Sequence, residues 1–221
     1  SPTLYSYRGR MEVSGSRISR EDFAAYITQV SDVIAAMTKD GYPHPTAFEI
    51  ETAVAFLFFK KENCDLVLLE VGMGGNLDAT NIIKNTLLAV LVSISMDHMS
   101  FLGNTLAQIA EKKAGIIKDG CRVVTARQKP EAMQVIERIS REHGAKCTIA
   151  DASEAEMLKE SCLGQTIRYR GEEYEIPLAG VYQKENAVVA LNALKVLDEL
   201  GFSTAAEQKK EGLRTVNWNG R

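Results

Sequence analysis

The stretch Asp65–Asn81, DLVLLEVGMGGNLDATN, contains the pattern that decides the fold. It begins with four consecutive apolar residues, 66–69, without the alternation of a half-exposed strand. Such a run is typical of a strand in a parallel sheet that is covered on both faces. Glu70 stands at the end of the run, and glycines follow at 72, 74 and 75. We therefore predict a buried strand over 66–70 that brings Glu70 to the carboxyl edge of a parallel sheet, where open α/β folds bind ligands.

Strand and helix patterns alternate along most of the chain, which favours an α/β fold with a mainly parallel sheet flanked by helices. The segment 165–178 differs, because its residues alternate around a turn at Arg170-Gly171-Glu172, and it predicts a small antiparallel β appendage. We expect one domain over 1–221. The other predicted strands are 87–94, 121–126 and 146–150, and the predicted helices are 19–37, 46–60, 105–118, 130–143 and 184–200.

Composition excludes several classes of protein. The 221 residues are 45% hydrophobic and 25% charged, with a net charge of −3, so neither a nucleic-acid surface nor a membrane surface is indicated. No run of 18 apolar residues exists, so no transmembrane helix is expected. The cysteines at 64, 121, 147 and 162 form no CxxC pair, which favours a cytoplasmic protein with reduced, mostly buried thiols.

One carboxylate side chain and one imidazole side chain stand at or just after the ends of the predicted buried strands. If the strands 66–70 and 87–94 are neighbours, Glu70 and His98 converge on one rim of the sheet. A carboxylate, an imidazole and water suit Mg²⁺ or Mn²⁺. The alternatives are a salt bridge from Glu70 to a nearby Lys or Arg, and a loop hydrogen bond for His98.

Three further residues are candidates for chemistry. Lys113 shares the apolar stripe of its predicted helix, whereas Lys112 lies off that stripe. A buried amine with a lowered pKa is one interpretation, and a lysine extending to water at the helix edge is the other. Asp78 either binds a ligand or caps a glycine-rich turn. Asn186 near the start of the last helix either contacts a ligand or caps that helix.

The chain carries no GxxxxGK[ST], GxSxG or HExxH motif. However, LLEVGMGGNLDATN, SISMDHMSFLGNTLAQIAEKKAGIIK and GVYQKENAVVAL resemble the folylpolyglutamate synthase/dihydrofolate synthase family of the Mur ligase superfamily. The segments SPTLYSYRGRM, TAFEIETAVAFLFF and WNGR resemble further motifs of that family, in the same order. Thr3 and Asn219 depart from it, since the family usually has His and Pro there.

The resemblance implies an ATP-dependent ligase that forms an acyl phosphate on a folate or dihydropteroate carboxylate and joins it to L-glutamate. It implies Mg²⁺ at Ser1, Glu70 and His98, with Glu70, His98 and a carbamylated Lys113 in the catalytic group. The implied ATP contacts are Asn186 and Arg221. The residues implied to bind the pterin are Thr46, Ala47, Phe48, Glu49, Leu77, Asp78 and Ala79.

The family's phosphate loop and its C-terminal domain have no counterpart in these 221 residues. We therefore expect the chain to be the central part of a monomeric enzyme and to be inactive alone. Two alternatives remain open. One is another amide-forming Mur ligase, such as a cell-wall peptide ligase, and the other is a truncated, non-catalytic binding protein.

Overall fold

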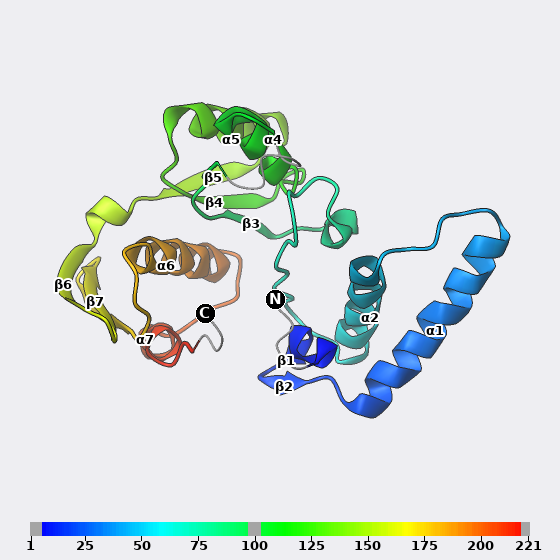
Figure 1. Cartoon of the computed structure of the whole chain (residues 1–221). Helices are drawn as coiled ribbons and strands as arrows, with labels where there is room; N and C mark the ends of the chain where they lie inside the picture. The colour runs from blue at the N-terminus through cyan, green and yellow to red at the C-terminus, as the bar shows by residue number, and fades with distance from the viewer. Residues whose placement is uncertain (1–5, 97–102, 218–221) are drawn as a thin grey trace. The chain divides into compact units, whose positions relative to one another are not determined.

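The computed structural model describes residues 6–96 and 103–217, and the chain divides into two compact units. Unit 1 comprises Ser1–Met73 and Leu77–Ile82, coloured blue to cyan in Figure 1. Unit 2 comprises Gly74–Asn76 and Ile83–Arg221 and is coloured mainly green to red.

Unit 1 is built on two helices that pack against each other. They are α1 (Arg20–Lys39) and α2 (Ala47–Lys61), and both follow a capping residue. Ser19 Oγ accepts a hydrogen bond from Asp22 N, while Thr46 and Glu49 form a capping box. The remaining elements are the hairpin strands β1 (Glu12–Val13) and β2 (Ser16–Arg17) and the 3₁₀ turns η1 (Tyr7–Arg10) and η2 (Ala79–Ile82).

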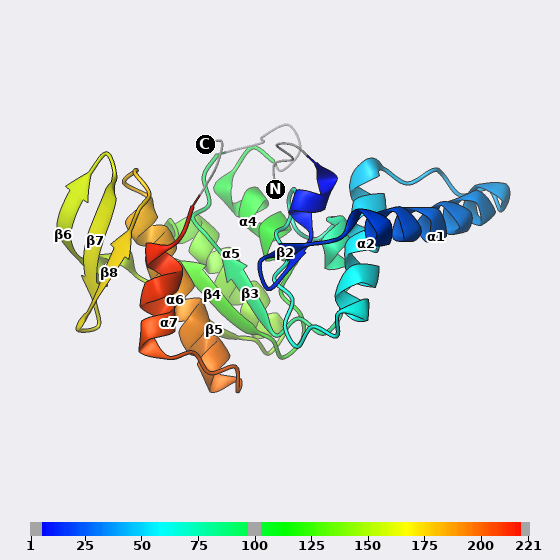
Figure 2. The ribbon, with the colours of Figure 1, turned by 90° about the horizontal axis from the view of Figure 1, so that it is seen from below.

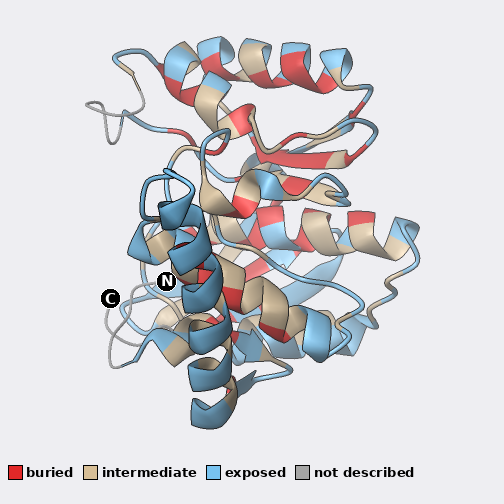
Figure 3. Ribbon diagram, turned by 90° about the vertical axis from the view of Figure 1, so that its right-hand side faces the viewer, coloured by how far each residue is buried: buried red, intermediate tan, exposed pale blue. Residues whose placement is uncertain are grey.

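The core of unit 1 is small. Its buried side chains are Met11, Ile18, Val54 and Phe58, against which one face of α1 packs. The rest of α1 is largely exposed, as the pale blue helix nearest the viewer in Figure 3 shows, and Val33 is 56% exposed. The prediction of a helix over 19–37 is therefore confirmed, and only part of the apolar surface of this helix is buried.

The prediction of a buried strand over 66–70 is wrong. The structure assigns no strand there, and Leu66, Val67 and Leu68 are 43%, 38% and 92% exposed. The physical reason is pairing: a strand needs a neighbour to satisfy its N–H and C=O groups, and this segment has no ladder partner among the described residues. Glu70 is likewise exposed and does not end a buried strand.

Unit 2 contains the predicted parallel sheet, with strand order β3-β4-β5. The strands are β3 (Leu88–Leu91), β4 (Arg122–Ala126) and β5 (Lys146–Ala150), all parallel. Helices α4 (Leu106–Ala114) and α5 (Pro130–Glu142) cover one face, and α6 (Gln183–Glu199) covers the other (Figures 1 and 2). Successive residues of β4 serve both sides, because Val123 packs with α4 and α5 while Val124 packs with α6.

The appendage is an antiparallel sheet in the order β6-β7-β8, visible at the left of Figure 2. Its strands are β6 (Glu156–Ser161), β7 (Gly164–Tyr169) and β8 (Glu172–Ile176), so the predicted hairpin is confirmed and gains a third strand. Arg170 and Gly171 connect β7 to β8 with φ values of +52° and +84°, as a tight two-residue hairpin turn requires.

Several boundaries differ from the sequence prediction. Helix α4 ends at Ala114, with Gly115 as its C-cap, and not at Lys118. Helix α7 (Ala206–Arg214) and the turn η3 (Ala152–Glu154) were not predicted. Helix α6 ends as predicted, since Gly201 follows it with a φ of +97°.

The cysteines only partly follow the prediction of mostly buried thiols. All four are free, but only Cys121 is buried, Cys64 and Cys147 are half-buried, and Cys162 is exposed at the turn after β6. Within residues 6–96 and 103–217, no helix combines the length and the apolar character that crossing a membrane requires.

Candidate functional site

The two segments predicted to bind a pterin meet at Gly72 in unit 1. A methyl group on Gly72 would lie 3.0 Å from Phe48 Cζ and 3.1 Å from Asp78 Oδ2, which is tighter than ordinary contact. Phe48 lies in the first turn of α2, and Asp78 immediately precedes η2. The sequence did not single out Gly72 as the contact between them, although its place in a glycine-rich loop was a signal for close approach.

Asp78 is the centre of a hydrogen-bonded turn. Its Oδ2 accepts from the backbone N–H of Gly72 at 2.9 Å and of Met73 at 3.0 Å. Its Oδ1 accepts from Thr80 N at 3.0 Å and from Thr80 Oγ1 at 2.6 Å. The capping alternative for Asp78 therefore has direct support in the structure.

The other residues of the two segments differ in what they expose. Glu49 Oε2 accepts from Thr46 N at 2.7 Å and from Thr46 Oγ1 at 2.8 Å, and these bonds lower the pKa of Glu49 below its usual value. Ala47 is exposed, Leu77 is 90% exposed, and Ala79 is half-buried. The polar residues Thr46 and Glu49 therefore hydrogen-bond to each other. The other residues described here, Ala47, Leu77 and Ala79, have apolar side chains.

Glu70 lines a cavity of about 100 Å³ in unit 1 together with Phe48 and Thr80. The same cavity contains an ion pair that the sequence analysis missed, in which Arg10 Nη1 lies 2.5 Å from Glu51 Oε2. The two side chains are 26% and 11% exposed, and Arg10 Nε is buried without a hydrogen-bond partner. The sequence did contain a signal, because Glu51 stands inside the apolar stretch of α2.

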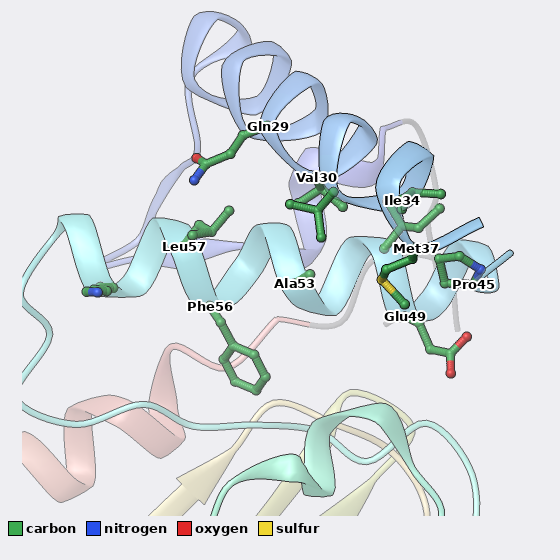
Figure 4. Close-up of a pocket in the computed structure, with 12 residues that line it drawn as sticks. Gln29, Val30, Ile34, Met37, Pro45, Glu49, Ala53, Phe56 and Leu57 are labelled. Carbon is green, nitrogen blue, oxygen red and sulfur yellow. The ribbon is translucent and has the colours of Figure 1, made fainter. Parts of the chain in front are cut away.

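A larger groove of about 500 Å³ lies between α1 and α2 (Figure 4). Its lining is mainly apolar, with Val30 and Ile34 from α1 and Ala53 and Leu57 from α2. Phe56 lines both this groove and the smaller cavity that contains Glu70. One aromatic side chain therefore borders both spaces within unit 1.

In unit 2, Lys113 stands in the last turn of α4, against the glycine loop. Asn76 N donates to Lys112 O at 3.1 Å, and a methyl group on Gly75 would lie 2.5 Å from Lys112 O and 2.8 Å from Lys113 O. Both Lys112 and Lys113 are half-buried, so their burial does not separate an inward Lys113 from an outward Lys112. The contact with the glycine loop explains this, because the loop covers the end of the helix that carries both residues.

Asn186 is the fourth residue of α6, so it is not the cap of that helix, whose N-cap is Tyr182. Its Nδ2 donates to Gln183 Oε1 at 3.3 Å, and Gln183 is buried at the first position of α6. Asn186 itself is half-buried.

Three predicted site residues, Ser1, His98 and Arg221, lie outside the described residues. Among the residues that are described, no group of three or more His, Cys, Asp or Glu side chains could hold a metal ion. Of the predicted magnesium ligands, the structure thus places Glu70 alone.

Comparison with known proteins gives these placements a family context. The family model for the Mur ligase middle domain matches residues 20–194, which is most of the chain. The chain belongs to the Mur ligase middle-domain family. The matched range includes both helices of unit 1, the parallel sheet of unit 2 and the candidate residues Glu70, Lys113 and Asn186.

The relatives of this Mur ligase domain include enzymes named as folylpolyglutamate synthases. The dihydrofolate synthase/folylpolyglutamate synthase of Bacillus subtilis is 37% identical over 231 residues, which cover 100% of this chain and 53% of the relative. An FPGS–AMPPCP–folate complex matches with a TM-score of 0.88 and 27% identity over 100% of this chain and 56% of its own. The folylpolyglutamate synthase of Thermotoga maritima matches with a TM-score of 0.85 and 30% identity, covering 100% of this chain and 51% of its own. The chain therefore spans about half the length of these relatives.

Proposed function

We propose that this chain is the central part of an ATP-dependent, ADP-forming ligase that joins L-glutamate to dihydropteroate or to a reduced folate. The observation that carries the proposal is the match of the whole chain to folylpolyglutamate synthases, among them an FPGS complex with AMPPCP and folate. No observation favours a cell-wall peptide as the acceptor. The proposal includes a cytoplasmic location.

The proposed reaction has two steps. The terminal phosphoryl group of ATP passes to a carboxylate oxygen of the pterin substrate, which gives an acyl phosphate and ADP. The amine of L-glutamate then attacks the acyl carbon, loses a proton and displaces inorganic phosphate, so that an amide forms. Phosphoryl transfer depends mainly on positioning and on charge stabilisation, which is the contribution expected of the protein.

The residues of unit 1 form the proposed pterin site. Phe48 provides a half-buried aromatic ring whose edge lies beside Gly72, and the exposed side chain of Leu77 adds apolar surface. The remaining members of the proposed site are Thr46, Ala47, Glu49, Asp78 and Ala79. The half-buried Lys113 and Asn186 of unit 2 are proposed to act at the nucleotide, the former after its neutral amine adds to carbon dioxide, which gives a carbamate and releases a proton. Arg221 is proposed as a further ATP contact.

The residues present fit a magnesium ion only in part. Glu70 is an exposed carboxylate beside a cavity, so it can donate oxygen to a hydrated cation, and Ser1 and His98 would complete the set. When bound, Mg²⁺ would neutralise phosphate charge. The charged side chains that line this cavity are Arg10, Glu51 and Glu70.

The chain carries no Walker-type phosphate loop, and we propose that it does not turn over alone. The test is calorimetric titration of the 221-residue chain with Mg-ATP and separately with folate, followed by an assay for ADP release with dihydropteroate or tetrahydrofolate and L-glutamate. We expect measurable folate binding, absent or millimolar ATP binding, and no ADP release.

The outcomes separate the parts of the proposal. Micromolar ATP binding with turnover would refute the inactivity of this chain and leave its reaction class standing. Turnover with a muramyl substrate and none with dihydropteroate would refute the folate assignment. The variant Phe48→Ala tests the pterin site. We expect it to weaken folate binding, because it removes the aromatic ring beside Gly72.

A further inference from the structure

Asp78 makes four hydrogen bonds to its own loop. A carboxylate has about four lone-pair positions, and here two are used by the amides of Gly72 and Met73 and two by Thr80. All four donors lie within 2.6–3.0 Å. Asp78 therefore has no acceptor position left for a hydrogen bond from a ligand.

The turn is also tightly packed. Thr80 is 8% exposed, and its hydroxyl contacts Oδ1 at 2.6 Å, so one side of the carboxylate faces the interior of unit 1. On the other side, Gly72 leaves just enough room for both Oδ2 and the ring of Phe48. A shift of the carboxylate would therefore release the backbone against which Phe48 packs.

From this geometry we infer that Asp78 is a positioning residue for the pterin site and not a contact residue. It holds the amides of Gly72 and Met73 so that the backbone at 72–73 supports the ring of Phe48. The inference rests on the proposed function, because it assigns the site to a pterin. Hydrogen bonds from peptide N–H groups to an ionised carboxylate are strong ones, which suits a residue that fixes a loop.

The bonding of Asp78 limits which groups of this loop remain for a ligand. With the carboxylate engaged, these groups are the half-buried ring of Phe48, whose edge lies beside Gly72, and the 90% exposed side chain of Leu77. A flat heteroaromatic ring that stacks on one face suits such a surface. Groups other than Asp78 would then hydrogen-bond to the edge of this heteroaromatic ring.

The test compares Asp78→Asn with wild type in two readouts. The first is amide hydrogen exchange of Gly72 and Met73, followed by NMR, and the second is folate affinity, followed by calorimetry. An amide nitrogen cannot accept a hydrogen bond, so Asn keeps one acceptor oxygen and loses the other. Because Asn carries no charge and hydrogen bonds to a charged group are stronger than neutral ones, we expect exchange at Gly72 and Met73 to rise by about tenfold or more, together with a drop in folate affinity.

The matched control is Asp151→Asn. Asp151 forms a similar turn in unit 2, where Oδ1 accepts from Ser153 N at 2.9 Å and from Ser153 Oγ at 2.7 Å. We expect this variant to leave amide exchange at Gly72 and Met73 and the affinity for folate unchanged. A second variant, Thr80→Val, removes the hydroxyl donor alone, and we expect it to give a smaller rise in exchange than Asp78→Asn.

Two results would overturn the inference. Wild-type exchange rates at Gly72 and Met73 in Asp78→Asn would show that the carboxylate does not hold the loop. A loss of folate affinity with unchanged exchange would show that Asp78 contacts the ligand directly. If wild-type chain binds no folate, the proposed function fails, while the exchange comparison still decides whether Asp78 fixes this loop.

Discussion

Replacement of Gly75 by alanine tests the contact between the glycine loop and α4. The new methyl group would lie 2.5 Å from Lys112 O, about 0.9 Å closer than the 3.4 Å at which ordinary contact begins. The obstacle is backbone, so the loop has to retreat and lengthen the hydrogen bond from Asn76 N to Lys112 O. Overpacking costs about 1–3 kcal/mol and a lost hydrogen bond about 0.5–1.5 kcal/mol, and the lower entropy of the unfolded chain offsets about 0.4–1 kcal/mol.

The expected net loss is thus about 2–3 kcal/mol of unfolding free energy, which lowers Tm by about 4–12 °C in a chain of this length. Urea unfolding followed by circular dichroism measures it. The control is Gly212→Ala in α7, where a methyl group would meet nothing within 4 Å, and we expect a gain of about 0.5–1 kcal/mol there. If Gly75→Ala falls within about 0.5 kcal/mol of Gly212→Ala, the reasoning from close approach is wrong.

Three further predictions concern charge and exposure. Glu51→Gln should destabilise unit 1 by about 2 kcal/mol in urea unfolding, because Arg10 keeps its charge and loses its partner; an unchanged midpoint would contradict this. The pKa of Asp151 is lowered to about 2, first by Arg127 and then by Ser153, so its stabilisation is complete above about pH 4 and is lost as the pH falls toward 2. Asp151→Asn should therefore show a flatter Tm between pH 5 and 2, and parallel curves for both proteins would refute this. Leu68→Ser should leave the unfolding midpoint unchanged and reduce aggregation measured by light scattering, since Leu68 is 92% exposed; a clear drop in the midpoint would show that Leu68 is packed.

Local signals in the sequence predict most of the secondary structure. The Thr46–Glu49 capping box and the Ser19 cap are interactions between residues three apart, so spacing alone identifies them. The signal for the strand over 122–126 is also local, because a short run of β-branched residues suits a strand that is buried on both faces. Where pattern and packing agree, the boundaries fall within a few residues of the prediction.

The failures arise where long-range pairing decides. The apolar run 66–69 has the composition of a strand, but composition does not supply the neighbour that a ladder needs. The contact of Gly75 with Lys112, like that of Gly115 with Asn76, joins residues more than 30 positions apart, and nothing in either glycine reveals its partner. Likewise, the sequence pattern indicates Asp78 as a candidate site residue, but it does not reveal that both carboxylate oxygens of Asp78 accept hydrogen bonds from its own loop.

The distribution of the four free thiols makes the wild-type chain suitable for site-directed labelling. Cys162 is exposed in unit 2, at the turn after β6, while Cys121 is buried and Cys147 half-buried. Since a thiol reagent needs access to the sulfur, a maleimide dye should modify Cys162 first. Cys64 in unit 1 is half-buried like Cys147, but burial raises the pKa of the Cys147 thiol and leaves less of it as reactive thiolate, so more extensive reaction should place a second probe at Cys64. A spin label at each of these two positions would report the distance between the units without any engineered cysteine.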